Sequence, residues 1–414
     1  MEQSNQSCIS LTAFADTPYI PAQLVQDIHG VLSVDCAEGQ VIESWHIVLA
    51  IDISGSMTGG KIEAVISSVM LILEHLRDAD RVSIIQFNDQ VTLLTETPVE
   101  LRDGRATLCS ILKNISVSGC TNITDAIIQS VAVARRRGCY SQIIMFTDGV
   151  HNAGSELRKA FDTISSMPFD RKIPINTFSV GPDPDAKELM KFASATGGDY
   201  AHVESTNQIC GKLLILIDNI ATTVSTNCIL TMTARAGGRI VGVNGVSRLR
   251  ELVVAKKYQI NVGSMYIGRS QKIMCRLSVR VLTDDEMCGN SVNDLQVIAD
   301  ITCVAGDATL SGDFHVSRIE DSILSQEHSD CLSDARLEKL MAEIIAKALD
   351  HAEDGELRRA EFAISEGISA LRSGYIRNKG AIDELTKLGE IFASGEQYNR
   401  RRNSAYEYMG CYNK

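Results

Sequence analysis

The 414-residue sequence has no close cysteine pairs, no long apolar run and no excess of basic residues. None of its twelve cysteines lies in a C-x-x-C pair, which excludes zinc ribbons and RING-type sites, whose ligands come in such pairs. The apolar segment 213–217 is far shorter than the roughly 18 residues that a membrane span needs. The net charge of −12 argues against nucleic acid as the main partner, because phosphate binding requires a basic surface.

The first residues also lack the basic segment followed by an apolar segment that marks a secretory leader. Together with irregularly spaced cysteines, best interpreted as reduced thiols, this predicts a cytoplasmic or nuclear protein that is not secreted. The chain contains neither H-E-x-x-H nor G-x-S-x-G, and its eight histidines are scattered. We therefore expect no enzymatic activity and no catalytic residues.

Residues 45–222 alternate apolar strands with amphipathic helices, of which the segment 61–77 has the clearest helical period. The predicted strands are 45–52, 81–87, 91–94, 142–147 and 174–180. Continuous apolar strands between helices indicate a sheet that is covered on both faces. The sequence therefore predicts a doubly wound α/β domain with a mostly parallel sheet.

The rest of the chain has a different character. Residues 223–320 alternate apolar and polar positions between Gly, Asn and Asp turns, which predicts a β-sandwich, and the extended segment 1–44 is expected to contribute strands to it. Residues 333–395 carry two apolar stripes, which predict a helical hairpin with a third helix at 381–392. The segment 396–414 is a polar tail that we expect to fray.

The segment VLAIDISGSMTGGKIEAV, residues 48–65, runs from a predicted strand through a small-residue loop into a helix. Within it, Gly55–Lys61 fits the G-x-x-x-x-G-K pattern of a phosphate-binding loop. The strand that ends at Asp148 is similar to a Walker B strand. However, Ile62 stands where that motif needs a serine or threonine hydroxyl for magnesium. A nucleotide-dependent ATPase that uses this loop is therefore the weaker of two interpretations.

The same loop offers oxygen ligands for a metal ion. Asp52, Ser54 and Ser56 alternate just past the end of the first strand, Thr121 lies in a loop before another helix, and Asp148 ends a later strand. Both strand ends fall at the carboxyl edge of the sheet, where doubly wound folds bind their ligands. Carboxylate and hydroxyl oxygens suit Mg²⁺ or Mn²⁺. On this interpretation the resemblance of the glycines and the lysine to a phosphate loop is coincidental.

The D-x-S-x-S motif that begins at Asp52, the distal Thr121 and the T-D-G strand end at Asp148 resemble the metal-ion-dependent adhesion site of the von Willebrand factor type A family. The resemblance covers roughly residues 45–220. It implies that the two serines bind the ion directly, that Asp148 binds through water, and that Asp52 binds mostly through water. Thr121 would bind directly or through water.

The resemblance implies a metal-dependent protein–protein interaction module with a scaffold or adaptor role. A partner's Asp or Glu carboxylate would complete the coordination of the ion. The remaining parts of the chain resemble those that accompany this domain in inter-alpha-trypsin inhibitor heavy chains and in bacterial and plant relatives. Cys120 departs from the family's G-G-T-N pattern beside Thr121, where its side chain could reposition the loop. A metal-independent scaffold is the second alternative, and the sequence identifies neither the partner nor the oligomeric state.

Overall fold

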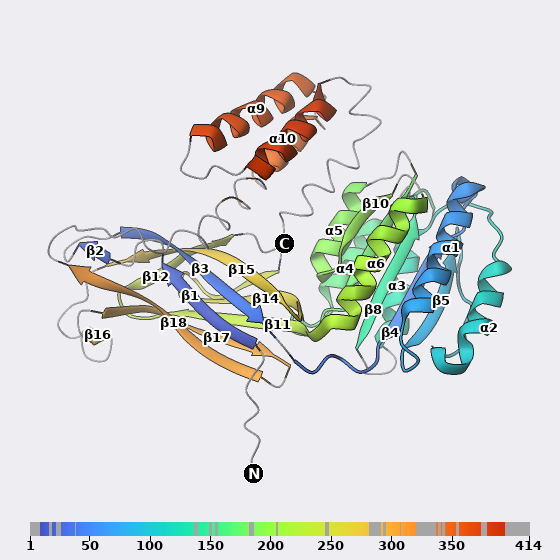
Figure 1. Ribbon diagram of the computed structural model, residues 1–414, viewed down its shortest axis with the longest axis horizontal. Helices are drawn as coiled ribbons and strands as arrows, with labels where there is room; N and C mark the ends of the chain where they lie inside the picture. The colour runs from blue at the N-terminus through green and yellow to red at the C-terminus, as the bar shows by residue number, and fades with distance from the viewer. Residues whose placement is uncertain are drawn as a thin grey trace, which may run out of the picture.

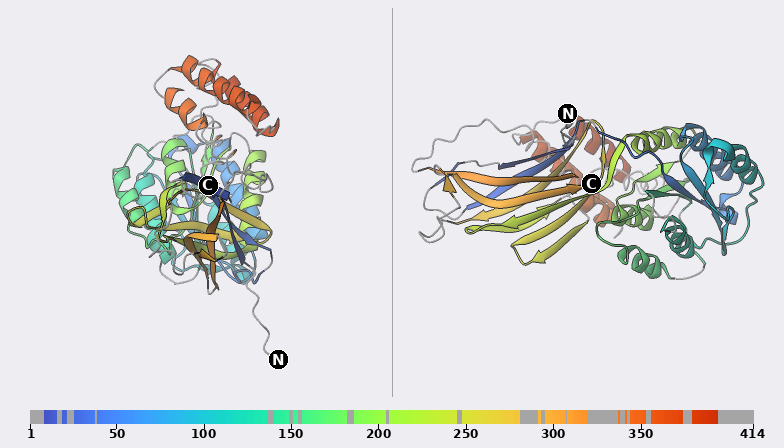
Figure 2. Two further views of the ribbon diagram at one scale, coloured as in Figure 1. Left: turned by 90° about the vertical axis from the view of Figure 1, so that its left-hand side faces the viewer. Right: turned by 90° about the horizontal axis from the view of Figure 1, so that it is seen from below.

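The structure is a computed structural model. It describes residues 9–15, 19–21, 26–37, 39–135, 140–148, 151–153, 156–181, 186–203, 206–244, 248–280, 291–292, 295–306, 308–319, 337, 341, 344–352, 356–373 and 379–393. These residues form an α/β domain, two further sheets and a group of C-terminal helices (Figure 1). Figure 2 shows the α/β domain beside the two sheets, with the C-terminal helices along one side of the molecule. The predicted tail, 396–414, lies outside the described residues.

The α/β domain is built on a sheet with the strand order β10-β9-β8-β4-β5-β6. The parallel strands are β4 (His46–Asp52), β5 (Arg81–Phe87), β8 (Ser141–Thr147), β9 (Ile175–Val180) and β10 (Tyr200–Val203). Two short strands, β6 (Val91–Leu93) and β7 (Val99–Glu100), pair antiparallel with β5. The predicted doubly wound, mostly parallel sheet is therefore confirmed.

Helices cover both faces of this sheet (Figure 1). They are α1 (Gly60–His75), α2 (Leu101–Lys113), α3 (Ile123–Arg135), α4 (Leu157–Ser165), α5 (Ala186–Thr196) and α6 (Thr206–Thr222). Along β4, Leu49 joins the core under α1 and α6, whereas Val48 and Ala50 join the core under α3, α4 and α5. Every residue of β4 is buried because the strand has helices on both sides, which explains its continuous apolar sequence.

Two further sheets lie beside the α/β domain, with the strand orders β1-β3-β15-β12 and β13-β14-β11-β17-β18-β2. All their pairings are antiparallel except that of β2 with β18, which is parallel. Their strands are β1 (Ile9–Ala15), β2 (Tyr19–Pro21), β3 (Gln26–Cys36), β11 (Thr223–Ala234), β12 (Gly238–Asn244), β13 (Leu249–Val253), β14 (Lys257–Tyr266), β15 (Arg269–Val279), β16 (Ser291–Val292), β17 (Leu295–Ala305) and β18 (Ala308–Ile319). Both sheets contribute to one apolar core, which includes Leu32, Leu230 and Phe314. Because β3 pairs with β15 along its whole length, the α/β domain is inserted between strands of these sheets.

The C-terminal helices are residues 344–352, α9 (Leu357–Ser373) and α10 (Lys379–Phe392). Their shared core also includes Met190 of α5, so these helices contact the α/β domain. Gly367 allows a close approach between two of the helices, since a Cβ there would lie 2.5 Å from the side chain of Ile344. Among the described residues, no helix is long and apolar enough to cross a membrane.

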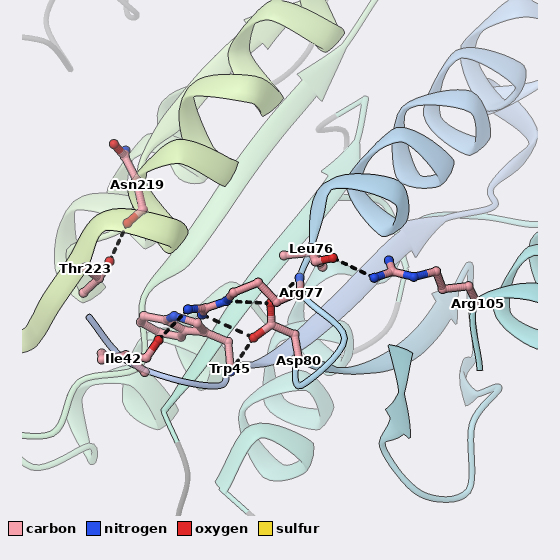
Figure 3. Close-up of polar contacts among 8 residues, drawn as sticks. All are labelled: Ile42, Trp45, Leu76, Arg77, Asp80, Arg105, Asn219 and Thr223. Carbon is pink, nitrogen blue, oxygen red and sulfur yellow. Dashed lines mark hydrogen bonds and ion pairs between the residues drawn. The ribbon is translucent and has the colours of Figure 1, made fainter. Parts of the chain in front are cut away.

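The incoming and outgoing segments of the α/β domain lie side by side (Figure 3). The N–H of Ile42 donates to the carbonyl of Thr223 at 2.9 Å, and the Arg77 guanidinium donates to the carbonyl of Ile42 at 2.8 Å. The buried Asp80 carboxylate accepts hydrogen bonds from the backbone N–H groups of Trp45 at 2.8 Å and of Arg77 at 2.9 Å. One buried carboxylate thus ties the incoming segment to the loop between α1 and β5.

We expect Asp80→Ala to lower the free energy of unfolding of the α/β domain by about 3 kcal/mol, because buried N–H groups and a guanidinium lose a charged acceptor. Trp45 is the only tryptophan of the chain and is fully buried, so its fluorescence during urea unfolding reports on this domain. The matched control is Asp78→Ala in the same loop. The Asp78 side chain is 64% exposed and pairs with Arg105, so its loss should cost under about 1 kcal/mol. Equal losses in the two variants would contradict the role given to Asp80.

Candidate metal centre

The predicted ligands come from three loops at the carboxyl edge of the α/β sheet. Asp52 ends β4, and Ser54 and Ser56 follow it in the loop through the 3₁₀ turn η1 (Gly55–Met57). Thr121 lies in the loop before α3, and Asp148 directly follows β8. Strands β4 and β8 are parallel neighbours, so their ends meet. The N–H of Gly55 donates to the carbonyl of Gly119 at 2.9 Å, which joins the first loop to the loop that carries Thr121. The structure therefore brings these loops together.

The first loop is organised around Asp52, which is fully buried. One carboxylate oxygen accepts the backbone N–H of Ser54 at 2.8 Å, and the other accepts the hydroxyl of Thr147 at 2.6 Å. The hydroxyl oxygens of Ser54 and Ser56 lie 3.0 Å apart, with Ser54 buried and Ser56 exposed. Thr147 was not among the predicted site residues. Its place directly before Asp148 in the T-D-G motif was the available signal.

Burial raises the pKa of Asp52 from its usual value of 3.8 to about 6, and the neighbouring negative charge of Asp148 acts in the same direction. The hydrogen bonds from Thr147 and Ser54 oppose this rise only in part. The ionised carboxylate is therefore destabilised where it stands. A cation bound beside it would offset that cost.

Two further oxygens of the candidate site are buried, the hydroxyl of Thr121 and the Oδ1 atom of Asp148. Neither has a hydrogen-bond partner among the residues that the structure describes. Buried polar atoms are nearly always paired in folded proteins, so these two oxygens are available to a ligand or an ordered water. The Oδ2 atom of Asp148 accepts from the ammonium of Lys61 at 3.2 Å. The donor set, with two carboxylates and three hydroxyls, fits a hard divalent cation.

Asn152 fixes the loop that carries Thr121. Its side-chain oxygen accepts the N–H of Thr121 at 2.7 Å, and its own N–H donates to the carbonyl of Thr121 at 3.1 Å. Sequence reasoning did not identify Asn152, because Asn is common in loops and this contact joins residues 31 positions apart. Cys120 is exposed while Thr121 is buried, so the departure from the G-G-T-N pattern leaves the threonine inside the site.

Gly119 is required in the turn before Cys120. Its φ of +80° is in the left-handed region, and a Cβ there would lie 2.2 Å from a carboxylate oxygen of Asp89. Within the described part of the chain, no group of three His, Cys, Asp or Glu side chains could hold a metal ion. The candidate centre is of a different kind, since most of its side-chain donors are hydroxyls.

Residues 47–151 match the family model of the von Willebrand factor type A domain. The α/β domain is a von Willebrand factor type A domain. Among curated proteins, inter-alpha-trypsin inhibitor heavy chain H3 of Mus musculus is 30% identical over 203 residues, which are 46% of this chain and 22% of the relative. The uncharacterized protein sll0103 of Synechocystis is 23% identical over 207 residues, which are 49% of this chain and 48% of the relative. The chain thus spans less than half the length of these relatives.

Solved structures extend the likeness beyond the von Willebrand factor type A domain. A von Willebrand factor type A protein from Catenulispora acidiphila aligns with a TM-score of 0.75 over 93% of this chain and 91% of that chain, at 16% identity. The ArnB paralog VWA2 from Sulfolobus acidocaldarius aligns with a TM-score of 0.64 over 98% of both chains, at 14% identity. At these identities the likeness establishes the fold, including the extra sheets and the C-terminal helices.

Asp52→Asn is expected to stabilise the metal-free protein at pH 7.5. The pKa of the Asp52 carboxyl is higher in the folded than in the unfolded protein, so the folded state is relatively most stable at pH values below the unfolded pKa, where the group is protonated. This contribution to the free energy of unfolding is lost as pH rises through the folded pKa of about 6. Above that pH the ionised group costs up to about 3 kcal/mol, which a neutral amide avoids while keeping one acceptor oxygen. Urea unfolding in EDTA, followed by Trp45 fluorescence, measures the difference. Asp89→Asn, an exposed carboxylate near the Gly119 turn, should change little, and a less stable Asp52→Asn protein would contradict the argument.

Proposed function

We propose that the von Willebrand factor type A domain of this chain binds Mg²⁺ or Mn²⁺ and uses the ion to bind an acidic side chain of a partner protein. The residues that would hold the ion are Asp52, Ser54, Ser56, Thr121 and Asp148. The observation that carries the proposal is the pair of buried, unpartnered oxygens on Thr121 and Asp148, in the described part of the chain, beside the fully buried Asp52 carboxylate. The protein would act as a scaffold or adaptor and not as an enzyme.

The proposed ligand residues would contribute to binding the ion in different ways. Asp52 is fixed in place by Thr147 and by the N–H of Ser54, so its charge is already oriented. The serine hydroxyls and Thr121 contribute neutral oxygens, which donate less charge to an ion than carboxylates do. The bound ion supplies a concentrated positive charge. Five residues of the chain offer ligands and an octahedral ion takes six, so a partner's Asp or Glu is a favourable further ligand.

The ATPase alternative has less support from the loop geometry. A phosphate cradle needs backbone N–H groups that point into the loop. Here the N–H groups of Met57 and Thr58 donate to the carbonyls of Ser54 and Gly55 at 3.0 and 3.3 Å, and the Gly55 N–H donates to Gly119. These N–H groups are therefore engaged within the protein. The metal-independent scaffold is the alternative that the two experiments below distinguish.

Mg²⁺ is expected to stabilise the wild-type protein against urea. At about 100 times its dissociation constant, an ion that binds only the folded state adds about 2.7 kcal/mol. Asp52→Asn and Thr121→Val should lose this response, and the control Asp89→Asn should keep it. Urea unfolding with Trp45 fluorescence, in Mg²⁺ and in EDTA, provides the measurement. An equal response to Mg²⁺ in Asp52→Asn would show that the ion acts elsewhere.

The immobilised wild-type chain is expected to retain a partner from cell lysate in Mg²⁺ and to release it in EDTA. The Asp52→Asn chain should retain none of it, because the carboxylate that anchors the ion is lost. The partner should then lose binding when one of its own Asp or Glu residues is changed to the amide. Partners that stay bound in EDTA and to the Asp52→Asn chain would favour the metal-independent scaffold.

A further inference from the structure

Lys61 lies at a position of its helix where a positive charge is unfavourable. It lies in the first turn of α1, where the positive end of the helix dipole disfavours a cation. Its ammonium nevertheless lies 3.2 Å from the Oδ2 atom of Asp148, whose side chain is only 6% exposed. Departures of this kind from local preference are typical of functional sites.

A second element provides the space for this side chain. Gly181 follows β9 with a φ of +107°, and a Cβ at that position would come within 2.7 Å of Lys61 Cε. The absent side chain of Gly181 therefore leaves room for the lysine stem, and the N–H of Gly181 is held by the carbonyl of Val203 at 3.0 Å. The lysine is thus held between the end of β9 and the candidate metal centre.

The charges of the site then follow from these residues. Asp52 and Asp148 contribute two negative charges when ionised, and Lys61 contributes one positive charge that Asp148 partly neutralises. A divalent ion would have to share Asp148 with the ammonium, and like charges in a partly buried site repel. Once the ion is bound, the lysine leaves the site with a net positive charge, which favours an anionic ligand.

We propose that Lys61 is a tethered cation that competes with the divalent ion for Asp148 and makes the loaded site selective for a carboxylate. This inference rests on the proposed function of the same site. It implies that metal and carboxylate strengthen each other's binding. The bound ion leaves the site with a net positive charge that the carboxylate neutralises, and the negative charge of the carboxylate in turn favours the bound ion. Lys61 acts here as a specificity-determining residue through its charge.

The experiment is a Mn²⁺ titration of the full chain, in which electron paramagnetic resonance measures the free ion. We expect Lys61→Met to bind Mn²⁺ about tenfold more tightly than wild type. Lys61→Gln should behave in the same way, and Lys61→Arg should stay close to wild type. The control is Lys347→Met, which removes an exposed lysine from an ion pair with Glu366 in the C-terminal helices and should change nothing. Trp45 fluorescence verifies that each variant is folded.

The outcomes separate this inference from the proposed function. If wild type binds Mn²⁺ and both neutral variants bind it equally or more weakly, the role of Lys61 is overturned while the metal site stands. If none of the proteins binds Mn²⁺, the proposed function itself fails. Replacing chloride by acetate at constant ionic strength tests the second half, because acetate should raise the Mn²⁺ affinity of wild type more than that of Lys61→Met. Equal gains would overturn the selectivity for carboxylates.

Discussion

The feature on which this site depends is a carboxylate buried at the end of the central strand of the sheet. Asp52 has no exposed surface, its ionised form is disfavoured by burial, and its oxygens are held by Thr147 and by the N–H of Ser54. Such a group is costly unless a cation or further donors stand beside it. The loops around it supply hydroxyls, a second carboxylate and a lysine, and together they give the site its chemistry.

The von Willebrand factor type A domain is joined to the strands of the other sheets at the opposite edge. The chain enters this domain just before β4 and leaves it where α6 passes directly into β11. The entering and leaving segments are hydrogen-bonded to each other, and Arg77 and Asp80 hold the entering segment in place. This junction lies at the amino end of β4 (Figure 3). Asp52 is the last residue of β4 and lies at its carboxyl end. A strand of this length spans roughly 20 Å, so the junction and the candidate site lie at opposite edges of the sheet.

The α/β fold could be predicted because its long strands are covered on both faces and are therefore largely apolar, as in β4 and β8. The short strands β7 and β10 were not predicted. In β10, the half-buried Tyr200 and the buried His202 both contact the hydroxyl of Ser179, at 2.9 and 3.0 Å. The burial of His202 depends on this hydrogen-bonding partner in another strand, which an apolar pattern does not reveal. Strand β7 was missed for a different reason, because its two residues are too few to show a pattern.

The sequence by itself determined the type of domain and the residues of the candidate site, because D-x-S-x-S, the distal Thr121 and the T-D-G strand end are short patterns in a recognisable strand and loop context. Only the tertiary structure decided how those groups are satisfied. It placed Thr147 and Asn152 as supports and left two buried oxygens without partners in the described chain. It also set the lysine of the apparent phosphate loop against Asp148, 87 positions away. Which charges pair and which buried atoms lack a partner depends on contacts between distant segments, and such contacts exist only once the sheet has formed.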